Sequence, residues 1–523
     1  GIKAIERFIG MFAIALFDEK KQEFIFIRDR AGVKPLFYYQ KNELILFASE
    51  LKSFHQHPKF EKKLDLNAVA AYMQYGNIPT PHCIFKNCTK IKPGHYLKIN
   101  LKNKSQEEIQ YWNVYDFYNK PKLNLSFPEA KIQTKEILKS AFNYRMVADV
   151  PVGVFLSGGY DSTTVTSLIQ AQSTTKVKTF TIGVPDIGLN EAPYARDIAK
   201  YLGTEHTEIN CTEKEAIEMI KDLPFFYDEP FADSSAIPTT LVSKEARKDV
   251  TVALSADGGD EVFGGYNRYD YMYRYGKTLN LIPNAIGKFL AGAMNNIPSE
   301  KIPILKNKYN FHNRYERLKT FLKNSNKKEI MLNLSQQFND EQMKSVMKSE
   351  FKSLPTMFQS KEMLENFKSP LSYMMAIDFQ TYMLDDILQK VDRATMSNSL
   401  EAREPMLDHR ILEFTAQLPD EYKYQNGLKK RILREITHDY IPKELLDRPK
   451  MGFAIPIAKW LKNELRDHVE EYLNEDRIEK QGIFNWDFIA KLKGDFFGDR
   501  KEYDSKLWYF LMFQMWHERW MEN

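Results

Sequence analysis

The sequence predicts a multidomain protein in which a layered β region precedes a parallel α/β domain with a helical C-terminal part. Three observations lead to this fold class. Short apolar strands alternate with polar turns through residues 1–110. Continuous apolar strands alternate with helical patterns after residue 128, as is typical of parallel sheets. Beyond residue 270 the apolar spacing is mostly helical.

The N-terminal region begins with two expected strands, residues 11–17 (MFAIALF) and 24–28 (FIFIR), joined by a polar turn. Residues 65–76 predict a helix that Asp65 caps. The spacing of apolar residues changes near SFPEAK, where a helical pattern begins. We therefore expect a first domain at 1–110, a linker at 111–127 and a second domain at 128–523.

Three apolar stretches predict the strands of the second domain: VPVGVFL, VKTFTIGV and VTVALS. Helical patterns follow the first two of these strands. Buried strands that alternate with helices are typical of a parallel sheet, whose ligands bind at the carboxyl ends of the strands. We therefore look for the functional site where these strands end.

Composition excludes several classes. The chain has 523 residues, and 74 basic against 70 acidic residues leave a net charge of +4, which gives no electrostatic argument for nucleic acid. Three cysteines make no disulfide framework, and no Cys or His spacing indicates zinc. The apolar runs are far shorter than the roughly 20 residues of a membrane span. We expect a soluble cytoplasmic protein without nucleic-acid or membrane partners.

The hexapeptide SGGYDS (residues 157–162) lies between an expected strand and an expected helix. Its N–H groups then lie at a helix N-terminus, where anions bind. Ser157 and Ser162 can donate hydrogen bonds to phosphate. Asp161 would repel phosphate and instead fits as a magnesium ligand. The sequence contains neither a Walker A loop nor a GxGxxG motif, so another type of phosphate loop is indicated.

A second polar cluster, SADGGDE (residues 255–261), follows the third expected strand. Three carboxylates among glycines are costly unless a cation lies close to them. Because ligands bind at the carboxyl ends of the strands of such a sheet, we expect the two clusters to face one crevice.

SGGYDS resembles the pyrophosphate loop of ATP pyrophosphatases, and with SADGGDEVFGGY it resembles the synthetase domain of glutamine-dependent asparagine synthetases. The resemblance covers nearly the whole chain. RDRAGVKPLFYY and FASELKS look like the end of that family's glutaminase domain, and IKPGHYL like its linker. Three further segments resemble later signatures of the family's synthetase domain: DEPFADSSAIP, LQKVDRATMSNSLEAREPMLDHR and RPKMGFAIPIAKWL.

The resemblance implies a fold and an activity. The fold would be a partial N-terminal-nucleophile-type glutaminase domain, then an α/β ATP pyrophosphatase domain of the adenine nucleotide alpha hydrolase-like kind with a helical C-terminal part. The enzyme would use ATP and Mg²⁺ to adenylate a carboxylate, by default that of aspartate, and ammonia derived from glutamine would then displace AMP to give asparagine. A homodimer is also compatible with the resemblance.

The resemblance also assigns residues. Those expected to hold pyrophosphate are Ser157, Gly158, Gly159, Asp161 and Ser162. Asp161 and Asp260 would bind magnesium, and adenosine would contact Leu156, Ile182, Ser255 and Ala256. The expected catalytic residues are Asp257, Arg393 and Lys450, since fixed cations stabilise departing pyrophosphate and a carboxylate accepts a proton from ammonia. Glu401 and Arg403 are either acceptor or ammonia-channel contacts or a structural ion pair.

The chain departs from the family at its start. The family's glutaminase uses an N-terminal cysteine, whose thiolate attacks glutamine, whereas residue 1 here is Gly. Cys83, Cys88 and Cys211 are expected to be structural. We expect the first half of the glutaminase domain to be missing and the chain as written to use free ammonia.

Three alternatives remain open at this point. A relative of the family could amidate a sugar acid for surface polysaccharides, since the adenylation step is the same. The tRNA-modifying pyrophosphatases share the loop, but the near-neutral charge and the lack of relay cysteines disfavour them. A non-catalytic nucleotide-binding module would not require Asp161, Asp257, Asp260 and Lys450 together.

Overall fold

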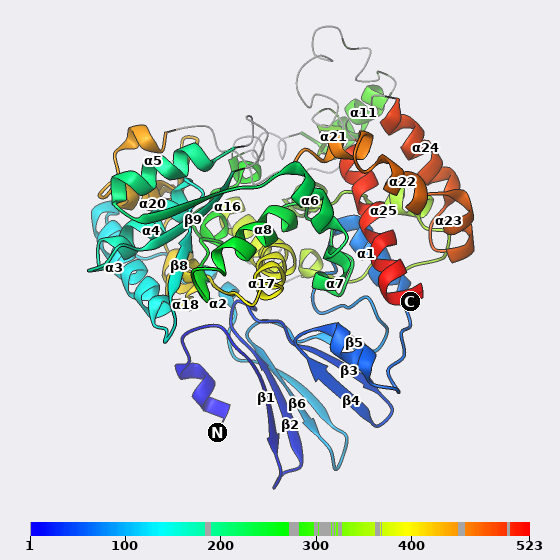
Figure 1. The fold of residues 1–523 in the computed structure, drawn as a ribbon, viewed down its shortest axis with the longest axis horizontal. Helices are drawn as coiled ribbons and strands as arrows, with labels where there is room; N and C mark the ends of the chain where they lie inside the picture. The colour runs from blue at the N-terminus through cyan, green and yellow to red at the C-terminus, as the bar shows by residue number, and fades with distance from the viewer. Residues whose placement is uncertain are drawn as a thin grey trace.

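A computed structural model describes most of the chain and shows two small sheets at one end of a larger α/β body (Figure 1). The described residues are 2–183, 190–270, 273, 282–295, 297, 302, 315, 318–319, 321–322, 327–360, 367, 369–447, 455–498 and 503–522. Among their helices, none is long and apolar enough to cross a membrane.

Both small sheets are antiparallel and are built almost entirely from the first 110 residues. One sheet has the order β1-β2-β6-β7, with β1 (Ala13–Asp18), β2 (Glu23–Arg28), β6 (His95–Asn100) and β7 (Gln106–Gln110). The other has the order β4-β3-β5, with β3 (Phe37–Lys41), β4 (Leu44–Ala48) and β5 (Cys88–Lys90). The two strands predicted at 11–17 and 24–28 are confirmed as β1 and β2, which pair directly.

The helix predicted at 65–76 is confirmed as α1 (Leu66–Tyr75). The Asp65 carboxylate accepts the N–H of Asn67 and caps the first turn. Gly76 ends the helix with φ 81°, a left-handed conformation that glycine adopts at little cost. The short helix α2 (Val114–Tyr118) then leads towards the second part of the chain.

A five-stranded parallel sheet forms the centre of the larger body, in the order β10-β9-β8-β11-β12. Its strands are β8 (Val152–Phe155), β9 (Lys178–Gly183), β10 (Glu205–Asn210), β11 (Val252–Leu254) and β12 (Glu401–Arg403). The three predicted strands are confirmed as β8, β9 and β11. The sequence reasoning missed β10, whose side chains alternate between exposed and half-buried, and β12, which is only three residues long.

Helices cover both faces of this sheet (Figure 1). One side carries α3 (Phe127–Met146), α4 (Tyr160–Gln170), α5 (Ala192–Leu202) and α20 (Arg431–Thr437). The other side carries α8 (Ala236–Ala246) and α17 (Leu388–Met396), which pack against each other. Shorter or neighbouring helices are α6 (Glu213–Ile220), α7 (Leu223–Tyr227), α9 (Gly259–Phe263), α11 (Asn284–Asn295), α13 (Lys327–Ser335), α14 (Asp340–Val346), α16 (Pro370–Gln380), α18 (His409–Ala416) and α19 (Asp420–Lys423).

The C-terminal helices close the larger body and also hold α1 (Figure 1). They are α21 (Ile457–Lys462), α22 (Arg466–Tyr472), α23 (Glu475–Gln481), α24 (Trp486–Phe497) and α25 (Asp504–His517). The Tyr72 hydroxyl of α1 donates to the Tyr509 carbonyl of α25 at 2.8 Å. One hydrophobic core includes residues of β3, α1, α8 and α25, so the N-terminal region packs directly on the second part of the chain.

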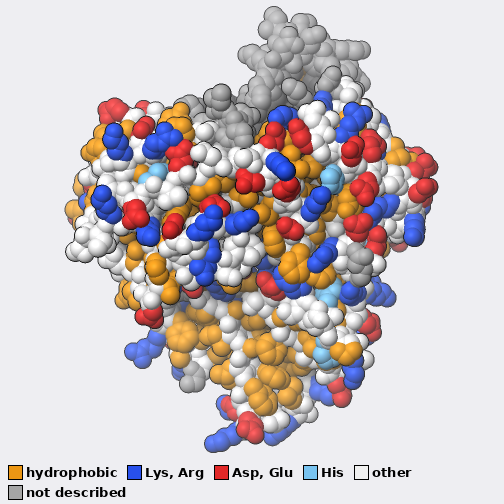
Figure 2. Space-filling model, in the orientation of Figure 1, with side chains coloured by type: hydrophobic (Ala, Val, Ile, Leu, Met, Phe, Trp, Pro, Cys, Tyr) orange, Lys and Arg blue, Asp and Glu red, His pale blue; other side chains and the backbone are white. Residues whose placement is uncertain are grey.

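Hydrophobic side chains gather on the surface of the lobe that holds the small sheets (Figure 2). Leu16 and Phe17 on β1 and Phe47 on β4 are between 43% and 46% exposed. An exposed apolar patch of this kind is typical of a surface that contacts further protein.

Candidate active site

One cavity of about 530 Å³ lies at the carboxyl ends of β8, β9 and β11. Both polar clusters that the sequence indicated line this cavity, which we call the nucleotide cavity. The predicted site residues that it brings together are Leu156, Ser157, Gly158, Gly159, Asp161, Ser162, Ile182, Ser255, Ala256, Asp257 and Asp260. The expectation of a shared crevice therefore agrees with the structure.

The loop at 157–162 turns at Gly158, whose φ of 74° would strain any other residue. Gly159 is the N-cap of α4. The N–H of Ser157 donates to Ser162 Oγ at 3.2 Å, and the two hydroxyl oxygens lie 3.1 Å apart. Two hydroxyl groups and the first N–H groups of an 11-residue helix thus lie together, which is a suitable arrangement for binding an anion.

Lys430 carries its ammonium group between the two predicted magnesium ligands. Its Nζ lies 2.6 Å from Asp260 Oδ1 and also contacts Asp161 Oδ2. Burial alone would lower the pKa of Lys430, but the attraction of Asp161 and then of Asp260 outweighs it and raises the pKa above its ordinary value. The two carboxylates therefore converge on one cation.

Two glycines allow this close approach. A Cβ atom at Gly259 would lie 2.4 Å from the carboxyl group of Asp161. A Cβ atom at Gly265 would lie 1.9 Å from Asp260 Oδ1 and 2.0 Å from Lys430 Cε. All three distances are far below van der Waals contact, so Gly259 and Gly265 leave room for the close packing of the acidic groups.

Asp257 is half-buried, lines the cavity and accepts a hydrogen bond from the Ser255 hydroxyl. Burial raises the pKa of Asp257, and the nearby Lys390 ammonium opposes that change. Lys390 lies on α17 and pairs with Asp233 Oδ2 at 2.9 Å. A carboxylate and a fixed ammonium group are thus available next to the phosphate loop.

The adenosine contacts expected from the sequence lie on the same wall of the site. Leu156 and Ile182 are 1% and 3% exposed and line the cavity together with Ala256. Phe180 and Val242 add further apolar surface to the lining. An apolar wall beside an anion-binding loop suits a ligand with a flat ring and a phosphate chain.

The structure does not bring Arg393 to the nucleotide cavity. Its Nη1 lies 3.0 Å from Glu50 Oε1, and its Nη2 donates to the Ser49 carbonyl at 2.7 Å. Arg393 therefore ties α17 to the N-terminal region and does not face the expected phosphates. Lys390, one helical turn earlier, takes the position at the cavity that the sequence reasoning gave to Arg393. Lys450 lies outside the described residues.

Four cationic residues of the cavity were missed at the sequence level: Lys390, Lys429, Lys430 and Arg434. The hairpin of β13 (Tyr424–Gln425) and β14 (Leu428–Lys429) positions two of them. Asn426 and Gly427 have φ of 51° and 87°, as a tight hairpin turn requires. An Asn-Gly pair is typical of a tight hairpin turn, but the pair does not indicate which site the two lysines reach.

Two further expectations concern residues outside the cavity. Arg403 Nε lies 2.7 Å from Glu401 Oε1, and Arg403 Nη1 donates to the carbonyls of Arg145 and Val147, which favours the structural ion pair. Cys83 and Cys88 are buried in the hydrophobic core. Burial raises the pKa of Cys83 well above its ordinary value and that of Cys211 to about 11, so neither thiol is activated.

Comparison with known proteins identifies the family. The model of the asparagine synthase family matches residues 133–518, and the glutamine amidotransferase domain model matches residues 1–112. The chain is 30% identical over 520 residues to a glutamine-hydrolysing asparagine synthetase 1 of Bacillus subtilis, covering 98% of this chain and 78% of that protein.

Two other relatives carry similar names. A putative asparagine synthetase 2 of Methanocaldococcus jannaschii is 38% identical over 294 residues, 54% of this chain and 56% of that protein. A putative asparagine synthetase of Mycobacterium bovis is 26% identical across 100% of this chain and 78% of that protein. With a glycine-containing loop and an acidic cluster meeting at the carboxyl edge of a parallel sheet, and with a family model matched over most of its length, the chain belongs to the asparagine synthase family.

Proposed function

We propose that the protein is an ATP-dependent ligase that adenylates the side-chain carboxylate of aspartate and converts it to asparagine with ammonia. The observation that carries the proposal is the nucleotide cavity, where loop 157–162, the aspartates 257 and 260 and two buried lysines lie around one space. The names of the relatives support asparagine as the product.

In the first step, a carboxylate oxygen of the acceptor attacks the α-phosphorus of ATP, and the bond from that phosphorus to the bridging oxygen breaks. Pyrophosphate leaves with the electron pair of that bond and so gains negative charge. The N–H groups of the loop and the hydroxyls of Ser157 and Ser162 would bind it. Lys430 and Lys390 would stabilise the charge that develops on it, since fixed cations act strongly in a buried site. Lys450 is proposed to act in the same way.

In the second step, ammonia attacks the acyl carbon of the adenylate, the bond to AMP breaks, and the amide forms. The attacking nitrogen must lose a proton. The Asp257 carboxylate is proposed to accept it, because it lies in the cavity near the phosphate loop. The apolar wall with Leu156, Ile182 and Ala256 is proposed to hold the adenosine of ATP and AMP.

Mg²⁺ is proposed to accompany ATP. The residues present fit this ion, because Asp161 and Asp260 already converge on one cation, the ammonium group of Lys430. Among the described residues, no group of three metal-binding side chains comes together. Magnesium commonly takes one or two protein carboxylates and completes its shell with phosphate and water, so two ligands suffice. The ion would neutralise charge on the phosphates.

The domain arrangement is part of the proposal. Residues 1–110 would belong to a glutaminase domain of the N-terminal-nucleophile type, 111–127 to a linker and 128–523 to a synthetase domain of the ATP pyrophosphatase type. The match of residues 1–112 to a glutamine amidotransferase model supports glutamine as the source of ammonia. The assay below supplies ammonia directly, so that it tests the synthetase reaction by itself.

The products of ATP test the proposal. We expect the purified chain, given ATP, Mg²⁺, aspartate and ammonia, to release AMP and pyrophosphate, which phosphorus NMR distinguishes from ADP and phosphate. Omission of aspartate should abolish the reaction. ADP as the main product, or nucleotide turnover that does not depend on any carboxylate acceptor, would refute the proposal.

A further inference from the structure

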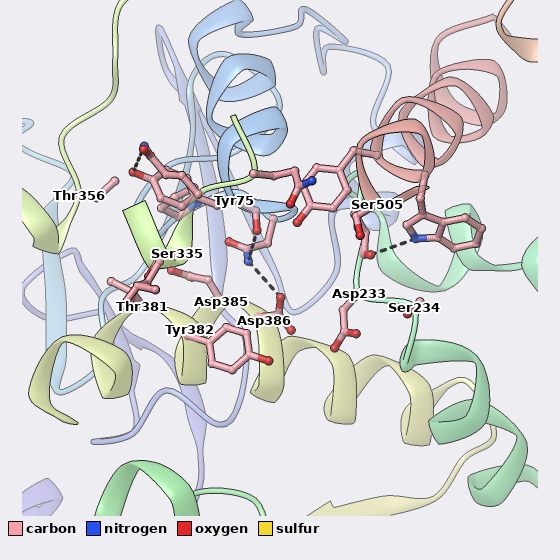
Figure 3. A pocket seen from close by; sticks show the side chains of 18 of the residues that line it. Tyr75, Asp233, Ser234, Ser335, Thr356, Thr381, Tyr382, Asp385, Asp386 and Ser505 are labelled. Carbon is pink, nitrogen blue, oxygen red and sulfur yellow. Dashed lines mark hydrogen bonds between the residues drawn. The ribbon is translucent and has the colours of Figure 1, made fainter. Parts of the chain in front are cut away.

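A second cavity, of about 360 Å³, lies next to the nucleotide cavity. An ion pair connects the two, since Asp233 lines the second cavity, Lys390 lines the first, and Lys390 Nζ lies 2.9 Å from Asp233 Oδ2. Figure 3 shows Asp233, Tyr382 and Asp386 directed towards this second space. We call it the side cavity. The ion pair therefore separates the side cavity from the nucleotide cavity by two side chains only.

Asp386 is the carboxylate of the side cavity with the weakest hydrogen bonding among the described residues, although the Lys390 ammonium group attracts it. Asp233 has Lys390, and Asp385 accepts the N–H and the hydroxyl of Thr80 at 3.0 and 2.6 Å. Asp386 is only 7% exposed, its Oδ2 accepts a long bond of 3.4 Å from Asn77, and its Oδ1 has no partner in the described part of the chain. A buried carboxylate in this state costs free energy until a donor reaches it.

The position of Asp386 on its helix relates it to the reaction site. It lies in a π-helical turn, η6 (Met383–Ile387), which leads directly into α17. Insertions of this kind occur frequently at functional sites. Lys390 follows Asp386 by four residues, so the two side chains share one helix face, with Asp233 between them. Burial, and then Asp233, raise the pKa of Asp386, and Lys390 opposes this change only in part, so a further positive group would favour the ionised carboxylate.

Arg268 provides a positive group next to Tyr382. Its guanidinium lies 4.8 Å from the centre of the Tyr382 ring and 4.6 Å from that of Tyr266. Asp378 holds Nε at 2.9 Å and Nη2 at 2.8 Å, so the guanidinium is fixed in place. Arg268 also lines the side cavity. Its remaining edge, at Nη1, is suited to a carboxylate of a ligand.

We propose that Asp386 binds an ammonium group of the acceptor and that Arg268 binds a carboxylate of the same molecule. The acceptor is then an amino dicarboxylate, held so that its second carboxylate points past Asp233 and Lys390 to the nucleotide cavity. This inference rests on the proposed function, because it concerns the molecule that is adenylated. Asp386 and Arg268 thereby become the residues that determine specificity against acceptors without an amino group, including sugar acids.

Three acceptors that differ by one group test this assignment. Aspartate has both recognised groups, succinate lacks the ammonium group, and β-alanine lacks the carboxylate that Arg268 would bind while it keeps the carboxylate that is adenylated. For each, kcat/KM is measured as pyrophosphate release with ATP, Mg²⁺ and ammonia, or Ki is measured against aspartate where turnover is slow. We expect the wild-type chain to prefer aspartate over succinate by about 10²-fold, since an unpaired buried charge penalises the analogue that lacks its partner.

Variants of the two residues should act selectively. Asp386→Asn should lower kcat/KM for aspartate and for β-alanine by about 10²-fold and leave kcat/KM for succinate nearly unchanged. Asp386→Glu, which keeps the charge, should retain the preference for an amino group and also serves if the Asn variant folds poorly. Arg268→Lys, which keeps a cation for Asp378, should lower kcat/KM for aspartate and succinate more than kcat/KM for β-alanine. The KM for ATP should change much less than the KM for aspartate in all three variants, because neither Asp386 nor Arg268 lines the nucleotide cavity.

The outcomes separate this inference from the proposed function. Equal losses for all three acceptors, or a wild-type chain that uses glucuronate or succinate as well as aspartate, would overturn the roles of Asp386 and Arg268. If no carboxylate supports pyrophosphate release by a folded chain, the proposed function itself fails. Thermal melting of each variant establishes that it is folded.

Discussion

Lys430 Nζ lies 2.6 Å from Asp260 Oδ1, at the point where the acidic cluster after β11 faces the phosphate loop. The lysine follows a tight hairpin, and the aspartate follows a strand of the parallel sheet. The same ammonium group contacts Asp161. One ammonium group from a distant segment therefore contacts both carboxylates.

Lys430→Met should lower the rate of pyrophosphate release by about 10²-fold, comparable to the loss of one preorganised donor in a buried site. Lys430→Arg should retain more activity because it keeps the charge. Lys248→Met, at an exposed residue of the same type that pairs with Glu245, is the matched control and should be close to wild type. A normal rate for Lys430→Met in single-turnover assays would exclude a role in charge stabilisation.

Asp161→Asn and Asp260→Asn should each raise the Mg²⁺ concentration that supports half-maximal activity, and removal of Mg²⁺ with EDTA should stop pyrophosphate release. The physical reason is the loss of a charged oxygen ligand for a hard cation. Activity titrations with MgCl₂ measure the effect, and circular dichroism checks the fold. An unchanged requirement for Mg²⁺ in both variants would show that these carboxylates are not its ligands.

Gly259→Ala should impair the use of ATP because the new methyl group would lie 2.4 Å from the Asp161 carboxyl and displace it. The expected result is a loss of kcat/KM for ATP of about tenfold or more, as expected when an active-site group moves by about 1 Å. Gly494→Ala is the matched control, since a Cβ atom there meets nothing within 4 Å on α24. That control should raise stability by about 0.5–1 kcal/mol.

Arg393→Met should destabilise the fold without acting on the chemistry. The change removes the cation that contacts Glu50 and Asp228, and the loss of one partner of a buried pair costs about 3–5 kcal/mol. Lys390→Met should have the opposite profile, with a larger loss of kcat. Urea unfolding and steady-state kinetics of both variants check this pair of expectations. A selective loss of kcat in Arg393→Met would restore its expected role at the phosphates.

Stability should fall as the pH rises from about 5 to 8. Burial raises the pKa of Glu404 to about 8, although Lys34 opposes the change. Between the ordinary pKa of 4.5 and this value, the folded protein keeps a proton that the unfolded chain releases. The contribution of Glu404 to the free energy of unfolding is therefore fully present below that pH window and decreases by about 1.4 kcal/mol per pH unit within it.

Glu404→Gln should therefore weaken the decline of the melting temperature between pH 5 and 8. Glu261, whose pKa burial also raises to about 8, should maintain part of the slope. Glu107→Gln, at an exposed position of β7, is the control. A variant that melts with the same pH dependence as the wild type would contradict the proton uptake assigned to Glu404.

The sequence by itself determined the phosphate loop and the acidic cluster. SGGYDS and SADGGDE each follow a continuous apolar strand, and the structure shows β8 and β11 as neighbours in a parallel sheet. The carboxyl ends of parallel strands share an edge, so local patterning was sufficient to predict that Ser157, Asp161, Asp257 and Asp260 would share one cavity. The helix at 65–76 was equally readable from its cap and its terminal glycine.

Only the tertiary structure decided which cations lie at that edge and which charged side chains line the side cavity. Lys390 and Arg393 lie three residues apart on one helix, yet Lys390 reaches the nucleotide cavity and Arg393 reaches Glu50 in the N-terminal region. Asp386 and Arg268 meet around Tyr382 from separate segments. Such contacts depend on how helices pack and rotate against one another, which a hydrophobic pattern restricts to a face but does not resolve to a single side chain.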